Sequence, residues 1–145
     1  MKMIIPAALI AAVIAAPAFA GNMNQDGGRK LSTALSGAME VPGPGDPDGT
    51  GTFSATVNAG QSKVCYTLSV AKIDPATMAH IHRGVAGAAG PVVTALKAPA
   101  AGTSMACAVV TRELAKELIA NPAGFYVNVH NAIYPAGAVR GQLSK

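Results

Sequence analysis

Three histidines lie in two short patterns of this 145-residue sequence, and it contains no others. One pattern is Ala79-His80-Ile81-His82-Arg83-Gly84, and the other is Phe125-Tyr126-Val127-Asn128-Val129-His130-Asn131. Side chains alternate between the two faces of a β-strand, so His80 and His82 share one face if the first pattern is a strand. Two imidazoles from one strand and His130 from another make three ligands of a kind that transition metals prefer. The spacing therefore predicts a three-histidine metal site.

Copper is the favoured ion and zinc the alternative, because imidazole binds both and copper heads the affinity order of the divalent metals. The spacing does not identify a fourth ligand. The candidates are three soft thioethers and one harder carboxylate, namely Met39, Met78, Met105 and Glu40. A thioether would favour Cu(I), and a carboxylate would favour Zn(II) or Cu(II). The competing interpretation is a structural network, in which the imidazoles bond to backbone or to Asn128 and hold no metal.

Enzymatic chemistry has less support in this sequence. A serine hydrolase would need a Gly-x-Ser-x-Gly elbow, which is missing. A glycosidase would need a carboxylate pair, and Asp46 and Asp48 fall in a turn-rich loop of prolines and glycines. The basic residues are dispersed and the chain has no tryptophan, which argues against nucleic-acid binding. We expect a binding protein, and redox turnover at a bound copper would require an open coordination position.

The first twenty residues have the features of a secretory signal peptide. Lys2 supplies a positive start, Ile4 to Ala16 form an apolar run, and Ala18-Phe19-Ala20 is a cleavage signature of small residues. An uncleaved membrane anchor is the alternative. Cleavage after Ala20 predicts a periplasmic or secreted protein with no membrane span, in which residues 21–29 form a polar, glycine-rich leader.

The chain has two cysteines, Cys65 and Cys107. In an oxidising compartment an even pair favours a disulfide over a metal or catalytic site. The chain-entropy model gives such a bridge roughly 3–5 kcal/mol of stabilisation.

The rest of the chain reads as short strands separated by glycine and proline turns. We expect strands at Leu31–Gly37, Thr52–Asn58, Lys63–Val70, Ala79–Arg83, Val92–Leu96, Met105–Val110, Gly124–Asn131 and Gly137–Leu143. One helix is expected at Thr111–Ala120, capped by Thr111 and stopped by Asn121-Pro122. This pattern predicts an all-β fold, an antiparallel Greek-key-like β-sandwich with one short connecting helix, in a single domain over residues 30–145.

Several motifs in this order resemble the CHRD domain, a family named from chordin. They are Leu35-Ser-Gly37-Ala-Met-Glu40-Val-Pro42, Val64-Cys-Tyr-Thr-Leu-Ser-Val70, Ala79-His-Ile-His-Arg-Gly84 with Gly90-Pro-Val92, Gly124-Phe-Tyr-Val-Asn-Val-His130, Tyr134-Pro-Ala-Gly137 and Val139-Arg-Gly-Gln-Leu143. The resemblance covers residues 31–143 and implies an extracellular or periplasmic β-sandwich module. Met39 stands where such proteins often carry an amide. The His-x-His strand also resembles the copper-binding strand of Cu/Zn superoxide dismutase, as a local analogy only.

Glu40 and Arg140 lie in two of these motifs, at opposite ends of the domain. We expect a structural ion pair between them, because a charge-assisted bond would fasten the first strand to the last. Two functions follow from the whole sequence. The first is binding of a metal ion through His80, His82 and His130, and the alternative is an extracytoplasmic protein-interaction module with structural histidines.

Overall fold

The computed structural model describes residues 27–145, so the predicted signal peptide at 1–20 and most of the predicted leader lie outside the described residues. The described chain contains strands, one α-helix and two single-turn 3-10 helices. In chain order the elements are β1 (Arg29–Ser36), η1 (Gly37–Met39), β2 (Thr50–Asn58), β3 (Lys63–Ala71), β4 (Ala76–Arg83), β5 (Val92–Leu96), β6 (Thr103–Val109), α1 (Arg112–Ala120), η2 (Pro122–Gly124), β7 (Phe125–Asn131) and β8 (Val139–Gln142).

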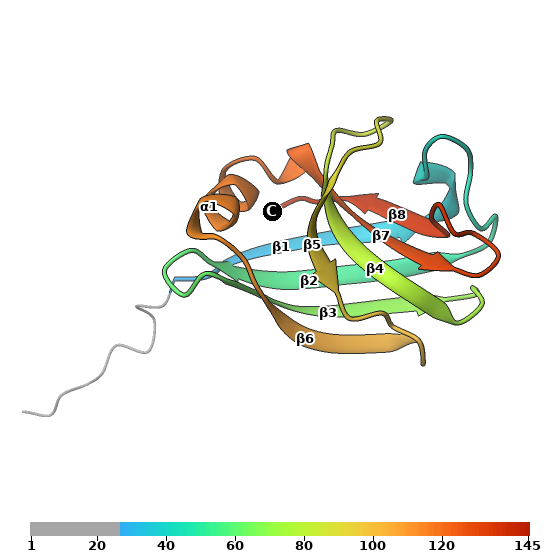
Figure 1. Ribbon diagram of the computed structural model, residues 1–145, viewed down its shortest axis with the longest axis horizontal. Helices are drawn as coiled ribbons and strands as arrows, with labels where there is room; N and C mark the ends of the chain where they lie inside the picture. Colours follow the sequence, from blue (N-terminus) through green and yellow to red (C-terminus); the bar gives the residue numbers. More distant parts are fainter. Residues whose placement is uncertain (1–26) are drawn as a thin grey trace, which may run out of the picture.

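All eight strands belong to one antiparallel sheet in the order β5-β4-β7-β8-β1-β2-β3-β6. The sheet curls so that its two halves cross and face each other, with α1 at one end (Figure 1). The edge strands nearly close it, since the Ser104 hydroxyl in β6 donates to the carbonyl of Lys97, just after β5, at 2.7 Å. The all-β prediction is confirmed, and the two layers are halves of one nearly closed sheet.

Period-2 alternation builds the core between the two halves. In β2, Phe53, Ala55 and Val57 are buried, while Thr52 and Ser54 are exposed. Apolar side chains of a half-buried strand gather on its core face because burial removes their surface from water. The inward side chains of the other strands complete one hydrophobic cluster.

The helix begins as the sequence predicts, whereas several strand bounds differ. Thr111 caps α1 by accepting a hydrogen bond from the Leu114 amide at 3.1 Å. The last strand is shorter than predicted, because Gly137 adopts a φ of 142° in the turn before β8. At the start of the domain, Gly37 leaves the predicted strand and begins η1. These departures occur where the backbone turns, which residue periodicity does not report.

The outward sides of the two sheet halves differ in what covers them. We call the outward side of β5, β4, β7 and β8 the loop-covered face; it carries His80, His82, Tyr126, Asn128, His130, Arg140 and Gln142. We call the outward side of β1, β2, β3 and β6 the bare face; it carries Ser32, Ser54, Thr56, Cys65, Thr67, Met105 and Cys107. Every residue of β7 is buried, because its inner side meets the core and its outer side meets loops.

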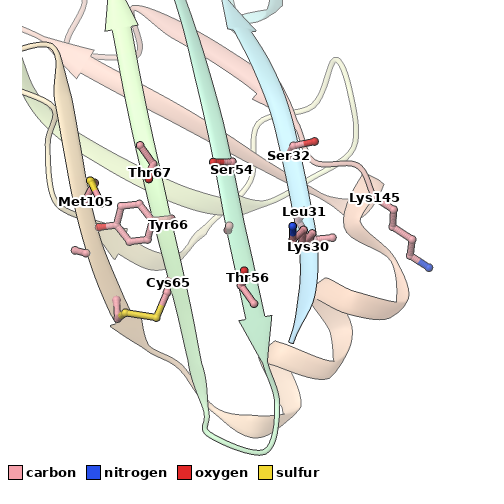
Figure 2. A pocket seen from close by; sticks show the side chains of 13 residues that line it. Lys30, Leu31, Ser32, Ser54, Thr56, Cys65, Tyr66, Thr67, Met105 and Lys145 are labelled. Atoms are coloured by element: carbon pink, nitrogen blue, oxygen red, sulfur yellow. A yellow bond between two sulfur atoms is a disulfide. The ribbon is translucent and has the colours of Figure 1, made fainter. Parts of the chain in front are cut away.

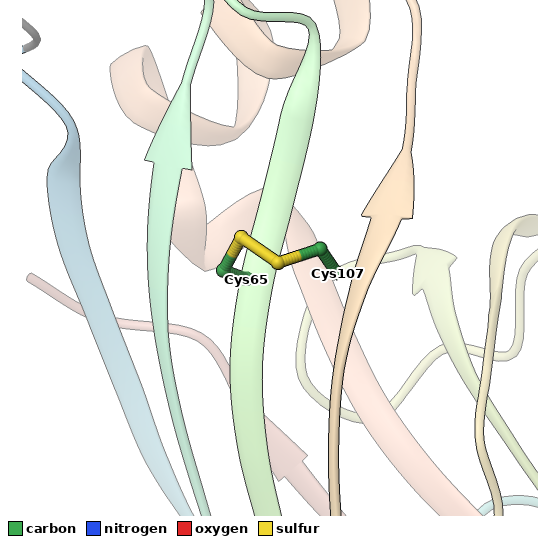
Figure 3. Close-up of a disulfide and its surroundings, with 2 residues drawn as sticks. All are labelled: Cys65 and Cys107. Carbon is green, nitrogen blue, oxygen red and sulfur yellow. A yellow bond between two sulfur atoms is a disulfide. The ribbon is translucent and has the colours of Figure 1, made fainter.

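Cys65 and Cys107 form a disulfide across the bare face (Figure 3). The two residues are direct partners in the register of β3 and β6. Within residues 27–145, no helix has the length and apolar character needed to cross a membrane.

Candidate metal centre

The three histidines come from two neighbouring strands on the loop-covered face. β4 and β7 pair antiparallel, with His80 opposite Asn128 and His82 opposite Tyr126. Ile81, between the two histidines of β4, is 1% exposed and points into the core. The imidazoles therefore lie on the side of the sheet opposite Ile81, as the alternation predicts.

The imidazoles form a compact cluster. One candidate ligand atom from each of His80, His82 and His130 can be chosen so that all three lie within 4.8 Å of one another. The nearest approach joins His80 Nδ1 to His130 Nε2 at 3.1 Å. Zn–N bonds are about 2.0–2.1 Å long, so ligand nitrogens around one ion lie roughly 3.3 Å apart in a tetrahedral site. A modest contraction of the cluster would therefore accommodate a metal ion.

Two loop carbonyls orient two of the rings. His82 Nδ1 donates to the carbonyl of Gly90 at 2.8 Å, and His130 Nδ1 donates to the carbonyl of Pro135 at 2.9 Å. A carbonyl only accepts, so both Nδ1 atoms carry the proton and both Nε2 atoms keep a lone pair in the neutral ring. His82 Nε2 is buried and has no hydrogen-bond partner among the described residues. A backbone carbonyl behind the imidazole is a common arrangement for metal-ligating histidine.

The environment keeps the His80 and His130 rings neutral. Burial is the largest cause that lowers the pKa of His80 below 6.5, and the neighbouring His130 and His82 lower it further. Burial also lowers the pKa of His130, partly offset by its bond to Pro135. Desolvation and a nearby cation both disfavour the imidazolium. Because metals bind the neutral ring, this electrostatic environment leaves the nitrogens of His80 and His130 available at neutral pH.

An aromatic ring connects the cluster to a buried arginine. Tyr126 stacks on His82 with ring centroids 4.7 Å apart and an interplanar angle of 7°. The Arg140 guanidinium carbon lies 3.4 Å from the centroid of the same tyrosine ring. Arg140 also donates to the carbonyl of Val85 at 3.0 Å, and the Gly90 amide donates to the Tyr126 hydroxyl at 3.1 Å. Residues 84–91 are thereby fastened over this part of the face.

Glu40 is connected to the histidine cluster through the side-chain amide of Asn128. Its carboxylate interacts with the Asn128 side chain, and Asn128 Oδ1 lies 3.1 Å from His130 Nε2. The carboxylate packs where Gly137 has no side chain, since a Cβ there would fall 2.4 Å from it. Burial raises the pKa of Glu40 to about 7, opposed by the charge of Arg140. Within residues 27–145 no hydrogen bond joins Glu40 to Arg140, so their interaction is electrostatic rather than a direct bond.

The four candidates for a fourth ligand lie in different places. Met78 is on β4, two residues before His80, and is 49% exposed. Met39 is in η1, and Glu40 follows it with its carboxylate behind Asn128. Met105 is on β6, on the bare face. The structure thus separates Met105 from the histidines by the core.

Sequence reasoning missed the loops that complete the site. The segment from Gly84 to Pro91 falls between two of the expected strands, where the sequence predicts only a glycine and proline turn, yet its carbonyls bind His82 and Arg140. Gly90 allows this path, because a Cβ there would lie 1.7 Å from the carbonyl oxygen of Arg83. The sequence signal was the density of glycines directly after the His-x-His strand. Arg83, which follows the His-x-His pair, forms an ion pair with Glu117 of α1.

A second concave region lies on the bare face, away from the histidines. Figure 2 shows this shallow groove, of about 680 Å³, with the hydroxyls of Ser32, Ser54 and Thr67 in the middle. Lys30 stands at one end, and Met105 and the disulfide at the other. No part of the histidine cluster contributes to it.

The CHRD domain family model matches residues 31–143 of the chain, which is nearly the whole described part. Comparisons with curated proteins and with solved structures give no match.

Proposed function

The chain belongs to the CHRD domain family, and we propose that it is an exported protein that binds a transition metal ion through His80, His82 and His130. One observation carries the proposal. His82 Nε2 is a buried, unpartnered acceptor beside two other imidazoles whose candidate ligand atoms lie within 4.8 Å. A buried acceptor without a partner costs about 1–3 kcal/mol. Coordination of a metal ion would remove that cost.

Copper is the ion we propose, with zinc as the alternative. Within residues 27–145 the cluster contains imidazoles and no carboxylate. Such a donor set suits copper and zinc rather than magnesium or calcium, which prefer oxygen ligands. Copper binds a given nitrogen site more tightly than zinc. The ion would be held by nitrogen atoms that two loop carbonyls have already oriented.

The competing function is an extracytoplasmic interaction module in which the histidines only hold loops in place. The bonds from His82 to Gly90 and from His130 to Pro135 favour such a role, since each ring anchors a loop. A purely structural role leaves the buried His82 Nε2 unexplained. Metal binding and loop anchoring are compatible, because they use different nitrogens of the same ring.

Export is part of the same proposal. The apolar N-terminal run with its small-residue cleavage signature, the family, and the disulfide are each typical of periplasmic or secreted proteins. An oxidising compartment would preserve the bridge between Cys65 and Cys107.

The test is a titration of the purified protein with Cu(II), Cu(I) and Zn(II), each with a competing chelator. We expect one equivalent of metal to bind, with nitrogen hyperfine structure in the Cu(II) electron paramagnetic resonance spectrum. A His80→Ala/His82→Ala variant should lose this binding. His82→Phe is a second variant, which retains an aromatic ring against Tyr126 but removes the ligand nitrogen.

The matched control is Thr56→Ala on the bare face, and thermal unfolding without metal reports whether each variant folds. Equal metal binding by the wild type and by a folded His82→Phe variant would contradict the proposal. Binding without oxidation or reduction of superoxide would identify a carrier or store rather than an enzyme.

A further inference from the structure

We propose that the thioether of Met78 is the fourth ligand of the histidine cluster and that the cluster consequently holds Cu(I) as well as Cu(II). This inference rests on the proposed metal site, and it adds that the site can bind copper in the Cu(I) state. Met78 is a large apolar side chain on the surface, 49% exposed, for which packing in the core gives no explanation.

The register places Met78 beside two of the three histidines. Met78 is the direct partner of His130 in the pairing of β4 with β7. It also shares a face with His80, because Ala79 between them is 1% exposed and points into the core. Directly opposite residues of an antiparallel pair have Cβ atoms about 4.5–5.5 Å apart. The thioether sulfur lies two bonds beyond Cβ, on a side chain with freely rotating torsions.

The backbone around Met78 departs from regular pairing. The register of β4 against β7 shifts between Ala76 and Met78, so the strand carries a bulge next to this residue. Bulges redirect side chains and are frequent beside functional sites. In the bulge, the Thr77 hydroxyl donates to the carbonyl of His130 at 3.3 Å, which fixes the approach of the two strands at that point.

The other three candidates are less well placed. Met105 points to solvent on the opposite side of the core. Met39 lies in η1, which packs against β8, and β7 separates β8 from the strand that carries His80 and His82. Glu40 lies behind Asn128, which stands between its carboxylate and His130. Met78 is the candidate that shares a strand with two of the histidines.

A donor set of three imidazoles and one thioether determines which ion the site binds most tightly. A thioether is a soft ligand that selects Cu(I), whereas imidazole serves both oxidation states of copper and also zinc. Adding the sulfur therefore raises affinity for Cu(I) more than for Cu(II) or Zn(II). Because Met78 is half exposed, its flexible side chain can rotate away from the histidines while an ion enters and then rotate back to bind that ion.

The test compares the full-length protein with a Met78→Leu variant of similar volume. Cu(I) affinity is measured by competition with bathocuproine disulfonate, and Cu(II) and Zn(II) affinities by competition with nitrilotriacetate. We expect Met78→Leu to weaken Cu(I) binding about tenfold or more, equivalent to about 1.4 kcal/mol. Its Cu(II) and Zn(II) affinities should change far less. Met105→Leu is the matched control, since it removes a thioether from the other face.

X-ray absorption of the Cu(I) form gives the second readout. The wild-type protein should show a sulfur scatterer at about 2.3 Å, a typical metal–sulfur distance, and Met78→Leu should show nitrogen scatterers only. A Met78→Leu variant that matches Met105→Leu in both measurements would overturn the inference and leave the three-histidine site intact. If His82→Phe loses binding of every metal while Met78→Leu does not, the three-histidine site and the role of Met78 as its fourth ligand are tested separately.

Discussion

The loop-covered face and the bare face are built by the same strand alternation, yet they differ in what lies on top of them. On the bare face the register runs without a shift from β1 to β6, and its hydroxyls meet solvent. On the loop-covered face the register of β4 shifts against both of its neighbours, against β7 between Ala76 and Met78 and against β5 between Ile81 and His82. Residues 84–91 and 132–138 then fold over this face, where Gly90 bonds to His82 of β4 and Pro135 bonds to His130 of β7.

Covering a sheet face turns exposed polar groups into buried ones, and each of these needs a partner. The Nη2 group of Arg140 meets this demand with the carbonyl of Val85, and the Nδ1 atoms of His82 and His130 meet it with the carbonyls of Gly90 and Pro135. His82 Nε2 does not meet it, and neither do Arg140 Nε and Glu40 Oε1. Of these three atoms, His82 Nε2 is the one that belongs to a cluster of possible metal ligands.

The two faces also differ in how they are held together. The bare half carries the only covalent bridge in the described residues, whereas the loop-covered half is held by hydrogen bonds and a stacked tyrosine. This difference predicts that the stability of the fold and the binding of metal can be changed independently. The substitutions that follow test that separation.

The largest effect is expected from removing the disulfide. The bridge joins residues 42 positions apart, and loop-closure entropy then gives about 4 kcal/mol of stabilisation. Cys65→Ala/Cys107→Ala should lose about this much free energy of unfolding in urea denaturation. Its metal affinity, measured where the variant is folded, should equal that of the wild type. A parallel loss of metal affinity would show that the two faces are coupled.

A smaller, pH-dependent effect is expected at Glu40. Its carboxyl ionises near pH 4.5 in the unfolded chain and at about 7 in the folded protein. The folded state therefore binds more protons between these values, and stability falls as pH rises through this interval, by up to ~3 kcal/mol. His80 and His130 act oppositely, because their lowered pKa values make stability fall as pH drops below 6.5.

Glu40→Gln should abolish the loss of stability between pH 5 and pH 8 that Glu40 causes. The measurement is the difference in unfolding free energy between variant and wild type across this range, which cancels the histidine contribution. A difference that does not change with pH would mean that Glu40 ionises normally in the folded protein.

Glu40 also shows what the sequence could and could not predict. Strand alternation was sufficient to place His80 and His82 on one face, because period 2 is a local property. The helix cap at Thr111 was equally local. The approach of His130 depends on the pairing of β4 with β7, which alternation does not report. The interaction of Glu40 with Asn128 depends on Gly137 leaving room for a carboxylate, from far along the chain. No spacing rule contains that information.

The loops were the other part that the sequence did not disclose. The carbonyls of Val85, Gly90 and Pro135 have no side-chain signature, although they orient the arginine and two of the histidines. Their positions depend on turns, and turns depend on the tertiary contacts that they make. The donor types could therefore be predicted, whereas the atoms that hold the donors in place could not.

Removal of the Asn128 side chain should weaken metal binding, and the affinity is measured where the variant is folded. Its side chain lies between Glu40 and His130 Nε2. Polar side chains that surround metal ligands are typically worth about 10–100-fold in metal affinity. Asn128→Ala should weaken Cu(II) binding by about that factor in a chelator competition, with Ser32→Ala on the bare face as control. Equal affinities for the two variants would remove Asn128 from the site.

The smallest effect is expected in the middle of the bare face, and it tests whether that face has a function of its own. Ser54 is exposed and pairs with Ser32 on one side and Thr67 on the other. Substitutions at such positions usually change stability by no more than ~0.5 kcal/mol. Ser54→Ala should stay within that range in urea denaturation and leave Cu(II) affinity unchanged. A larger loss of stability would mean that the hydroxyls of the bare face help to hold the sheet together, in addition to the disulfide.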